Sequence, residues 1–355
     1  MGSVVAQICR VGRATFCRGG AGGRRRPHRA FCAGGRQSAV DPPRGRQRAQ
    51  RRLPESCTVA RVAEQWGRAA GYRGTVALNV VVPNPSWKIV LVALDLWDHV
   101  CILRFAAPTD RENPFWLLNS WTITTDRGTS HVSRSGGGSS LRWLVKLEPS
   151  LPDDTKEIRV SHAPNDRRRH SEASLPTESN LVVALPSQRV SVKPAGTRLD
   201  GDADLRPPVE AGLNLENEPL QPDRVIPVSA QLDDAVVGRD ICVLSIEVRP
   251  SWFFLHLGGS GELAPAPDQA PDSGLVETMK LLGHRWSVED NRGGQYWGTV
   301  MSSHSGWPWT IDAVFTPALD PSAARLALEF PNPFGNGVIH TTVELPPVGD
   351  PGQRP

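Results

Sequence analysis

The sequence has little lysine, tyrosine or methionine, and it lacks a long apolar run. Only 5 of its 40 basic residues are Lys, and its 355 residues include 2 Tyr and 3 Met. Such an excess of Arg over Lys is typical of a GC-rich coding bias, so it does not in itself indicate nucleic-acid binding. No stretch approaches the roughly 18 consecutive apolar residues of a membrane-spanning helix. We therefore expect no membrane span.

Paired cysteines are also missing. The 6 Cys are widely separated, and none forms a C-x-x-C pair or precedes two suitably spaced histidines, so no zinc site is predicted. Cys101 and Cys242 lie in apolar runs, which favours buried, inert thiols. Arg10, Arg13 and Arg18 interrupt the N-terminal region, which therefore lacks the apolar block of a secretory signal. We expect a cytoplasmic protein without disulfides.

Positive charge is concentrated at the N-terminus. Residues 1–58 contain 13 Arg, no Lys and 2 acidic residues, a net charge of +11, whereas the whole chain has +3 and residues 59–355 therefore sum to −8. Residues 1–57 have almost no apolar periodicity and cannot bury a core, which predicts a disordered Arg-rich tail. An upstream extension from a misplaced start codon, a basic arm that contacts nucleic acid, and a targeting peptide are the alternatives.

The chain that follows predicts one short helix and then many strands. Residues 58–72 contain apolar residues at helical spacing, and alternation then predicts a strand at Val76–Val82 that Pro83 ends. Apolar runs at 88–97 and 99–105 predict the next two strands. Residues 164–223 are polar, Pro-rich and charged in both signs, which predicts a flexible linker with one possible strand in "LVVALPSQRVSV". Residues 346–355 are expected to form a disordered tail.

Three blocks of the sequence occur twice in the same order. Gly138–Val160 aligns without a gap to Gly306–Leu328, with apolar residues matched at alternate positions. Upstream of it, Trp121–Gly128 aligns with Trp286–Gly293 and Leu94–Phe105 aligns with Ile246–Leu257. We interpret this as an internal duplication of a domain of about 90 residues, a period far too long for a solenoid.

Each copy predicts six or seven short strands separated by turns. The turns "TDRG" and "DNRG" place Gly where the backbone needs a positive φ, and Pro149 and Pro317 are expected to end matching strands. This pattern favours an all-β protein of two Ig-like β-sandwich domains, residues 73–163 and 224–345, with a closed barrel as the structural alternative. Trp121 and Trp286 are expected to be a matched pair of core residues.

Four elements, "VIPV", "LSIEVRPSWFFLHL", "WSVEDNRGGQY" and "FTPALDPSAARLAL", resemble the tandem β-sandwich repeats of uncharacterised proteins from high-GC actinobacteria. The resemblance covers about residues 75–162 and 225–331. It implies the fold and the two-copy architecture but no activity. The first copy departs from the repeat, because "TTDRGTSHV" has no tyrosine at the position of Tyr296.

Residues with catalytic or ligand chemistry are scattered. Asp126, Asp290 and Asn291 precede turn glycines, where their conformational preference explains them. "DGDADL" begins like a calcium loop but lacks the required Gly and Glu. The 9 His form no helical pair, and no Ser completes a G-x-S-x-G motif. We therefore predict no catalytic residue, no metal site and no cofactor.

Tryptophan is the one residue type in excess, with 11 copies. Trp297 and Trp307 have no aromatic counterpart in the first copy. Together with His304 and Pro308 they form the candidate ligand or partner surface, because two neighbouring indoles offer a flat platform for a sugar ring or a side chain. Packing on an edge strand is the alternative interpretation.

The leading hypothesis from these features is a non-enzymatic scaffold that binds a protein partner through exposed strand edges or loop tips. A carbohydrate or small-ligand module that uses Trp297 and Trp307 is the alternative. Nucleic-acid association through residues 1–57 is the weaker alternative.

Overall fold

The computed structural model describes residues 71–83, 88–107, 121–139, 142–162, 179–185, 192–201, 219–237, 240–260, 284–304, 308–334 and 336–347. The expected all-β fold is confirmed: the described residues form two large sheets and one four-residue helix, α3 (Asp234–Val237). The predicted N-terminal tail, residues 58–70 of the predicted helix, and residues 348–355 lie outside the described ranges. At the boundary, Tyr72 begins a strand rather than ending a helix.

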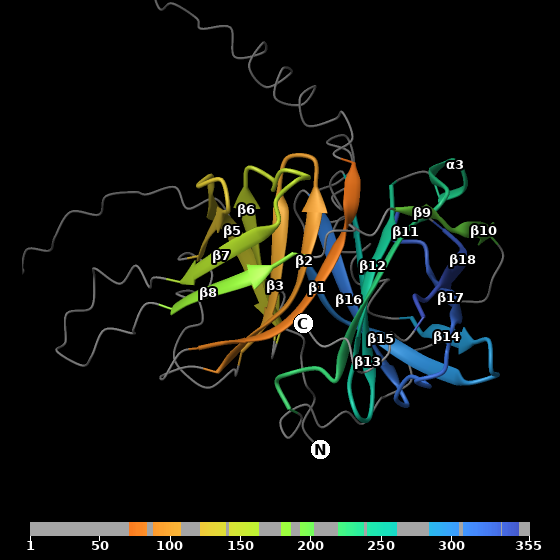
Figure 1. Cartoon of the computed structure of the whole chain (residues 1–355). Coiled ribbons are helices and arrows are strands. Elements are labelled where there is room, and N and C mark those ends of the chain that lie inside the picture. Colours follow the sequence, from red (N-terminus) through yellow and green to blue (C-terminus); the bar gives the residue numbers. More distant parts are fainter. Residues whose placement is uncertain are drawn as a thin grey trace, which may run out of the picture. The chain divides into compact units, whose positions relative to one another are not determined.

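The first sheet has eight antiparallel strands in the order β1-β2-β3-β6-β5-β4-β7-β8 (Figure 1). The strands are β1 (Tyr72–Val82), β2 (Ile89–Trp97), β3 (Cys101–Ala106), β4 (Trp121–Thr125), β5 (Ser130–Ser139), β6 (Arg142–Glu148), β7 (Glu157–His162) and β8 (Ser179–Ala184).

The second sheet has ten strands in the order β10-β18-β17-β14-β15-β16-β13-β12-β11-β9. Its strands are β9 (Lys193–Pro194), β10 (Gly196–Asp200), β11 (Arg224–Gln231), β12 (Cys242–Val248), β13 (Phe253–Gly259), β14 (Trp286–Asp290), β15 (Gln295–His304), β16 (Trp309–Thr316), β17 (Arg325–Pro331) and β18 (Val338–Glu344).

The two sheets share one strand order. If β1 to β8 are matched in sequence to β11 to β18, both sheets have the same order, and β9 and β10 are additions at the two edges of the second sheet. The details of the backbone also match. A β-bulge interrupts the pairing of β1 with β2 and of β11 with β12 at corresponding places, and each contains a non-glycine residue with positive φ, Asn79 (46°) and Ser229 (51°).

Turns and strand ends follow the predictions. Gly128 and Gly293 have φ of 78° and 87°, which glycine adopts without the steric cost of a Cβ. Strands β6 and β16 end immediately before Pro149 and Pro317, each of which follows a cis peptide bond.

Each sheet encloses its own hydrophobic core, which makes each domain sandwich-like. In the first, Trp121 lies in a core built from β1–β4 and β6–β8; in the second, Trp286 lies in the corresponding core. Both tryptophans are 1% exposed, as predicted. On β16, the apolar residues at alternate positions lie in the core of the second domain: Trp309, Ile311, Ala313 and Phe315.

The flexible linker predicted for residues 164–223 is wrong at β9 and β10, whereas the possible strand predicted in "LVVALPSQRVSV" is present at its N-terminal end as part of β8. Strand β8 pairs with β7 and extends the first sheet, whereas β9 and β10 pair with β11 and β18 of the second sheet. Polarity and proline content are typical of linkers, but they do not exclude strands at a sheet edge. A strand at a sheet edge needs only one apolar face and backbone groups that can pair. A mostly polar sequence such as "GTRLD" can therefore form an edge strand.

Candidate functional site

Among the described residues, most of the buried charged side chains lie where the outer faces of the two sheets meet. Apolar contacts surround them: Tyr72, Trp97 and Ile102 of the first sheet cluster with Cys242 and Leu244 of β12. Strands β2 and β13 are buried along their whole length, because one face lines the core of its own sheet and the other faces the opposite sheet. Any charged residue on these strands is therefore removed from water.

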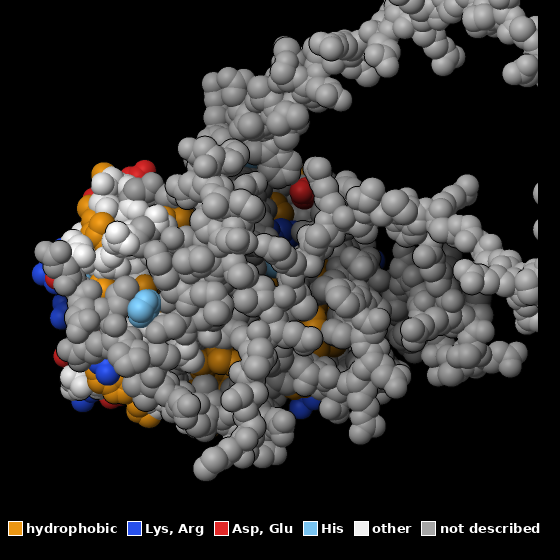
Figure 2. Space-filling model, turned by 180° about the vertical axis from the view of Figure 1, so that it is seen from behind, with side chains coloured by type: hydrophobic (Ala, Val, Ile, Leu, Met, Phe, Trp, Pro, Cys, Tyr) orange, Lys and Arg blue, Asp and Glu red, His pale blue; other side chains and the backbone are white. Residues whose placement is uncertain are grey.

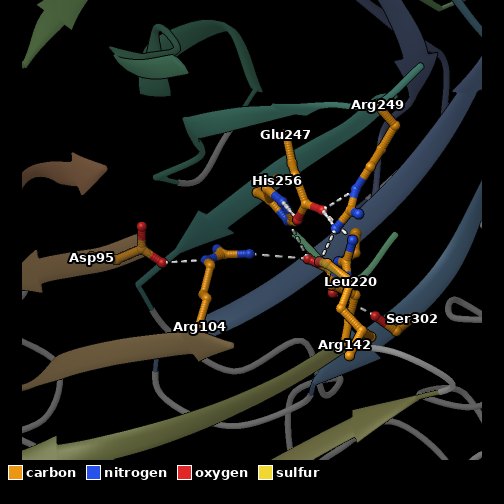
Figure 3. Close-up of polar contacts among 9 residues, drawn as sticks. Asp95, Arg104, Arg142, Leu220, Glu247, Arg249, His256 and Ser302 are labelled. Atoms are coloured by element: carbon orange, nitrogen blue, oxygen red, sulfur yellow. Dashed lines mark hydrogen bonds and ion pairs between the residues drawn. The ribbon is translucent and has the colours of Figure 1, made fainter. Parts of the chain in front are cut away.

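A chain of three contacts crosses from one sheet to the other (Figure 3). The Nε of Arg104 on β3 donates to Oδ2 of Asp95 at 2.5 Å, and its Nη1 donates to Oδ1 of Asp312 on β16 at 3.0 Å. The same Oδ1 lies 2.7 Å from Nδ1 of His256 on β13, and the second oxygen of Asp312 accepts from Ser302 at 2.6 Å. Burial alone would raise the pKa of Asp312, but His256 and Arg104 hold it well below its usual value.

A second carboxylate, that of Glu247 on β12, accepts hydrogen bonds from two guanidinium groups. Arg249 donates to its Oε1 at 2.8 Å through Nε, and Arg142 of the first sheet donates to the same oxygen. Burial raises the pKa of Glu247, but Arg142 and His256 outweigh that effect and lower it to about 2. Arg249 also donates to the carbonyl of Leu220 at 2.6 Å, which fixes the segment before β11.

The two groups of ion pairs are related by the same alignment as the strands. Asp95 of β2 corresponds to Glu247 of β12, and Arg104 of β3 corresponds to His256 of β13. In each sheet an acid therefore stands on the second strand of the copy and a base on the third. The first sheet also supplies a guanidinium group to each of two acids of the second sheet: Arg104 reaches Asp312, and Arg142 reaches Glu247.

Lys146 of β6 forms a separate buried contact between the sheets. Its Nζ donates to the carbonyl oxygen of Pro308 at 2.7 Å, and the residue is 5% exposed. Burial lowers the pKa of Lys146 to about 7, and the attraction of Glu148 offsets only part of that effect. Burial and the nearby Lys146 lower the pKa of His304 to about 4. Both groups are therefore pushed towards their neutral forms.

The structure does not gather the predicted ligand surface into one place. Trp297 pairs with Thr316 at one end of β15, whereas His304 pairs with Thr310 at the other end, about 23 Å away at 3.3 Å per residue. His304 and Pro308 instead line the contact with Lys146, and Pro308 is buried. Trp307 lies outside the described residues.

Trp297 has a partner of its own. The guanidinium of Arg285 lies 3.7 Å from the centre of the Trp297 ring, a close cation–π contact, and the ring is only partly exposed. One face of the indole is therefore occupied by a side chain of the same sheet. His304 does not lie beside Trp297, because the two residues stand at opposite ends of β15, whereas the pairing of Trp297 with Trp307 stays a prediction.

The remaining candidates have local structural contacts. Asp290 accepts hydrogen bonds from the backbone of Arg292 and Gly294 and from the Tyr296 hydroxyl, which closes the turn as its sequence predicts. In the first copy, the place of Tyr296 is taken by His131, which is fully buried with Nδ1 2.6 Å from the carbonyl oxygen of Pro149. Among the described side chains, no group of three or more His, Cys, Asp or Glu is arranged to hold a metal ion.

The described surface is chemically mixed on the face that Figure 2 presents. Hydrophobic, basic and acidic side chains there occur in several small groups beside one another. Within the described ranges, no helix has the length and hydrophobicity to span a bilayer.

Comparisons with known proteins add little. No protein-family model matches the chain, and no curated protein matches it significantly. One solved structure, described as a conserved domain protein from Bacillus anthracis, is similar over 72% of this chain and 78% of that chain, with 10% sequence identity and a TM-score of 0.22. A likeness this weak carries no argument about fold or function.

Proposed function

We propose that the protein is a non-enzymatic scaffold in which two β-sandwich domains are held in a fixed relation and present their sheet edges to protein partners. The observation that carries this proposal is the buried ion-pair network between the sheets. Its acids and bases neutralise one another: Asp312 binds Arg104 and His256, and Glu247 binds Arg142 and Arg249.

The geometry of these ion pairs favours positioning over chemistry. A buried pair is sensitive to the placement of its partners, because removing either leaves an uncompensated charge in a medium that solvates it poorly. Arg104 and Arg142 both reach across to the second sheet, so a change in the relation of the sheets would break both contacts. We infer that the network specifies how the two domains pack.

We further propose that the two domains arose by duplication. The shared strand order, the matching bulges, and the matching left-handed residues Asn79 and Ser229 support a common origin. The resemblance to tandem repeats of high-GC actinobacteria agrees with this proposal. The assignment of each domain to the Ig-like class stays a prediction. The two buried free thiols, Cys101 and Cys242, support the proposed cytoplasmic location.

Calorimetry of the full chain tests the scaffold proposal. If the ion pairs couple the two domains, the protein unfolds in one transition, and Asp312→Asn, which weakens the bonds to both Arg104 and His256, separates it into two. Asp153→Asn is the matched control, because the side chain of Asp153 is 73% exposed in its pair with Arg73. Two independent transitions in the wild-type protein would contradict the proposal. So would turnover in a broad hydrolase screen that substitution of His256 abolishes.

A further inference from the structure

The outer edge of β8 differs from the edge that corresponds to it in the second domain. Strand β18 pairs on one side with β17 and on the other with β10, in antiparallel register from Gly196 opposite Thr342 to Asp200 opposite Val338. Strand β8 pairs with β7, and no second strand among the described residues pairs with it. Among the described strands, this position therefore carries one more strand in the second domain than in the first.

The pairing of β10 shows what this edge accepts. Five residues in extended conformation bond to β18, and Leu199 packs against the hydrophobic core while its neighbours face outward. An occupant of the β8 edge thus needs an antiparallel strand of about five residues with an apolar side chain on the face that continues the core.

Strand β8 itself meets that requirement. Val183 is part of the core of the first domain and Leu181 packs against it, whereas Asn180, Val182 and Ala184 face outward. The strand "SNLVVA" has no charged residue. Edge strands that avoid pairing usually carry charges or proline, and β8 carries neither.

We propose that β8 pairs with β8 of a second copy of this chain, in antiparallel orientation about a two-fold axis at Val182. This proposal rests on the scaffold function and names one partner for it. At 52%, Val182 is the most exposed of the large hydrophobic side chains in the described part of the chain. The two copies of Val182 face each other across the axis, and Leu181 faces Val183 of the partner, so the inner faces of the two sheets continue into one another.

Absence of charge makes the self-pairing possible. A two-fold axis places a charged residue near its own copy, and like charges directly opposite each other in a sheet are unfavourable. From Ser179 to Ala184 this conflict does not arise. The pairing leaves no free strand edge at β8, so the assembly closes as a dimer rather than growing into a fibre.

Sedimentation analysis of the full chain tests the proposal over a concentration series up to about 100 µM. The wild-type protein is expected to double its mass with increasing concentration. Val182→Lys is expected to raise the dissociation constant at least tenfold, because two introduced ammonium groups face each other. Val182→Glu should weaken the dimer in the same way, and an equimolar mixture of the two variants should restore a heterodimer. This rescue depends on β8 facing β8.

Val132→Lys provides the control. Val132 is 40% exposed, close to Val182, but it lies on β5, which is paired with strands on both sides. Its substitution should leave the dimer unchanged, and circular dichroism of all variants checks that they fold.

Three results would overturn the self-pairing. They are a wild-type monomer at about 100 µM, a dimer that Val182→Lys leaves intact, and failure of the mixed variants to associate. A monomer that unfolds in a single calorimetric transition would contradict the self-pairing and leave the scaffold proposal standing. A dimer that unfolds in two independent transitions would contradict the scaffold proposal and support the self-pairing.

Discussion

Nη1 of Arg104 on β3 lies 3.0 Å from Oδ1 of Asp312 on β16, and this ion pair joins the first sheet to the second. The two residues are separated by 208 positions in the sequence, and both are at least 90% buried. Arg104 also binds Asp95 of its own sheet at 2.5 Å. One guanidinium therefore compensates a carboxylate in each sheet, which makes it the most informative residue to change.

Arg104→Gln should destabilise the protein by about 3–5 kcal/mol, because it leaves Asp95 and Asp312 buried without a full countercharge. Chemical denaturation measures the change in the free energy of unfolding. The control is Arg127→Gln, which breaks an ion pair with Asp154 whose two side chains are 62% and 53% exposed, and should cost less than about 1 kcal/mol. Equal effects of the two substitutions would mean that the buried ion pairs of Arg104 contribute no more to the free energy of unfolding than the exposed pair of Arg127.

The protein should become more stable as the pH rises above about 7. The pKa of Lys146 is lowered to about 7 by burial, below its value in the unfolded chain. Between these values the unfolded chain holds the proton and the folded protein releases it, so a rise in pH favours folding by up to about 1.4 kcal/mol per pH unit.

Lys146→Met should remove this pH dependence and stabilise the protein at pH 6, where the wild-type protein must bury an ammonium group. Lys156→Met is the matched control, because Lys156 is exposed. Denaturation at pH 6, 7, 8 and 9, chosen to bracket the pKa of Lys146, measures both effects. If the free energy of unfolding of Lys146→Met changes with pH as steeply as that of the wild-type protein, another group causes the pH dependence.

His304 should titrate well below free histidine. Burial and the nearby charge of Lys146 lower its pKa to about 4. From the ordinary pKa of histidine down to about 4, the unfolded chain binds a proton and the folded protein does not, so stability falls as the pH falls through this window. NMR titration of the imidazole measures the pKa directly. In Lys146→Met the pKa of His304 should rise, because the repulsive charge of Lys146 is gone. An unchanged pKa would mean that Lys146 does not influence His304.

Gly259→Ala should destabilise the second domain. A Cβ at this position would lie 2.1 Å from the carbonyl oxygen of Asp240 and 2.4 Å from the ring of Trp309, and neither the backbone nor a fully buried indole can move aside cheaply. The cost should be about 1–3 kcal/mol, the usual range for overpacking. Gly196→Ala, where nothing lies within 4 Å of the new carbon, should change little. A thermal melt of both variants compares them.

The all-β fold could be predicted because its signal is local. Alternation of apolar residues, a turn glycine and a strand-ending proline each depend on a few neighbouring positions, so Trp121 and Trp286 could be matched and placed in two cores. Strands β9 and β10 were harder to predict, because they are short and polar and their pairing depends on where distant strands lie. Residue spacing does not encode that information.

The interface network was missed for a related reason. Its members are far apart in the sequence, and no motif connects them. A signal was nevertheless present: Asp95 in "LVALDLW", Glu247 in "VLSIEV" and Asp312 in "WTIDAVF" are single charges inside apolar strands. A strand that is apolar on both faces except for one charge indicates that its second face is also buried, and that the charge has a partner there.

The path of the chain between the domains limits how they can be taken apart. Residues 193–200 belong to the second sheet, because β9 lies beside β11 and β10 beside β18. An excision that begins at Arg224 would remove both flanking strands and expose β11 and β18 at once. Such a fragment would have two unpaired strand edges that are prone to aggregation. In the intact protein, residues 193–200 of the connecting segment cover both edges.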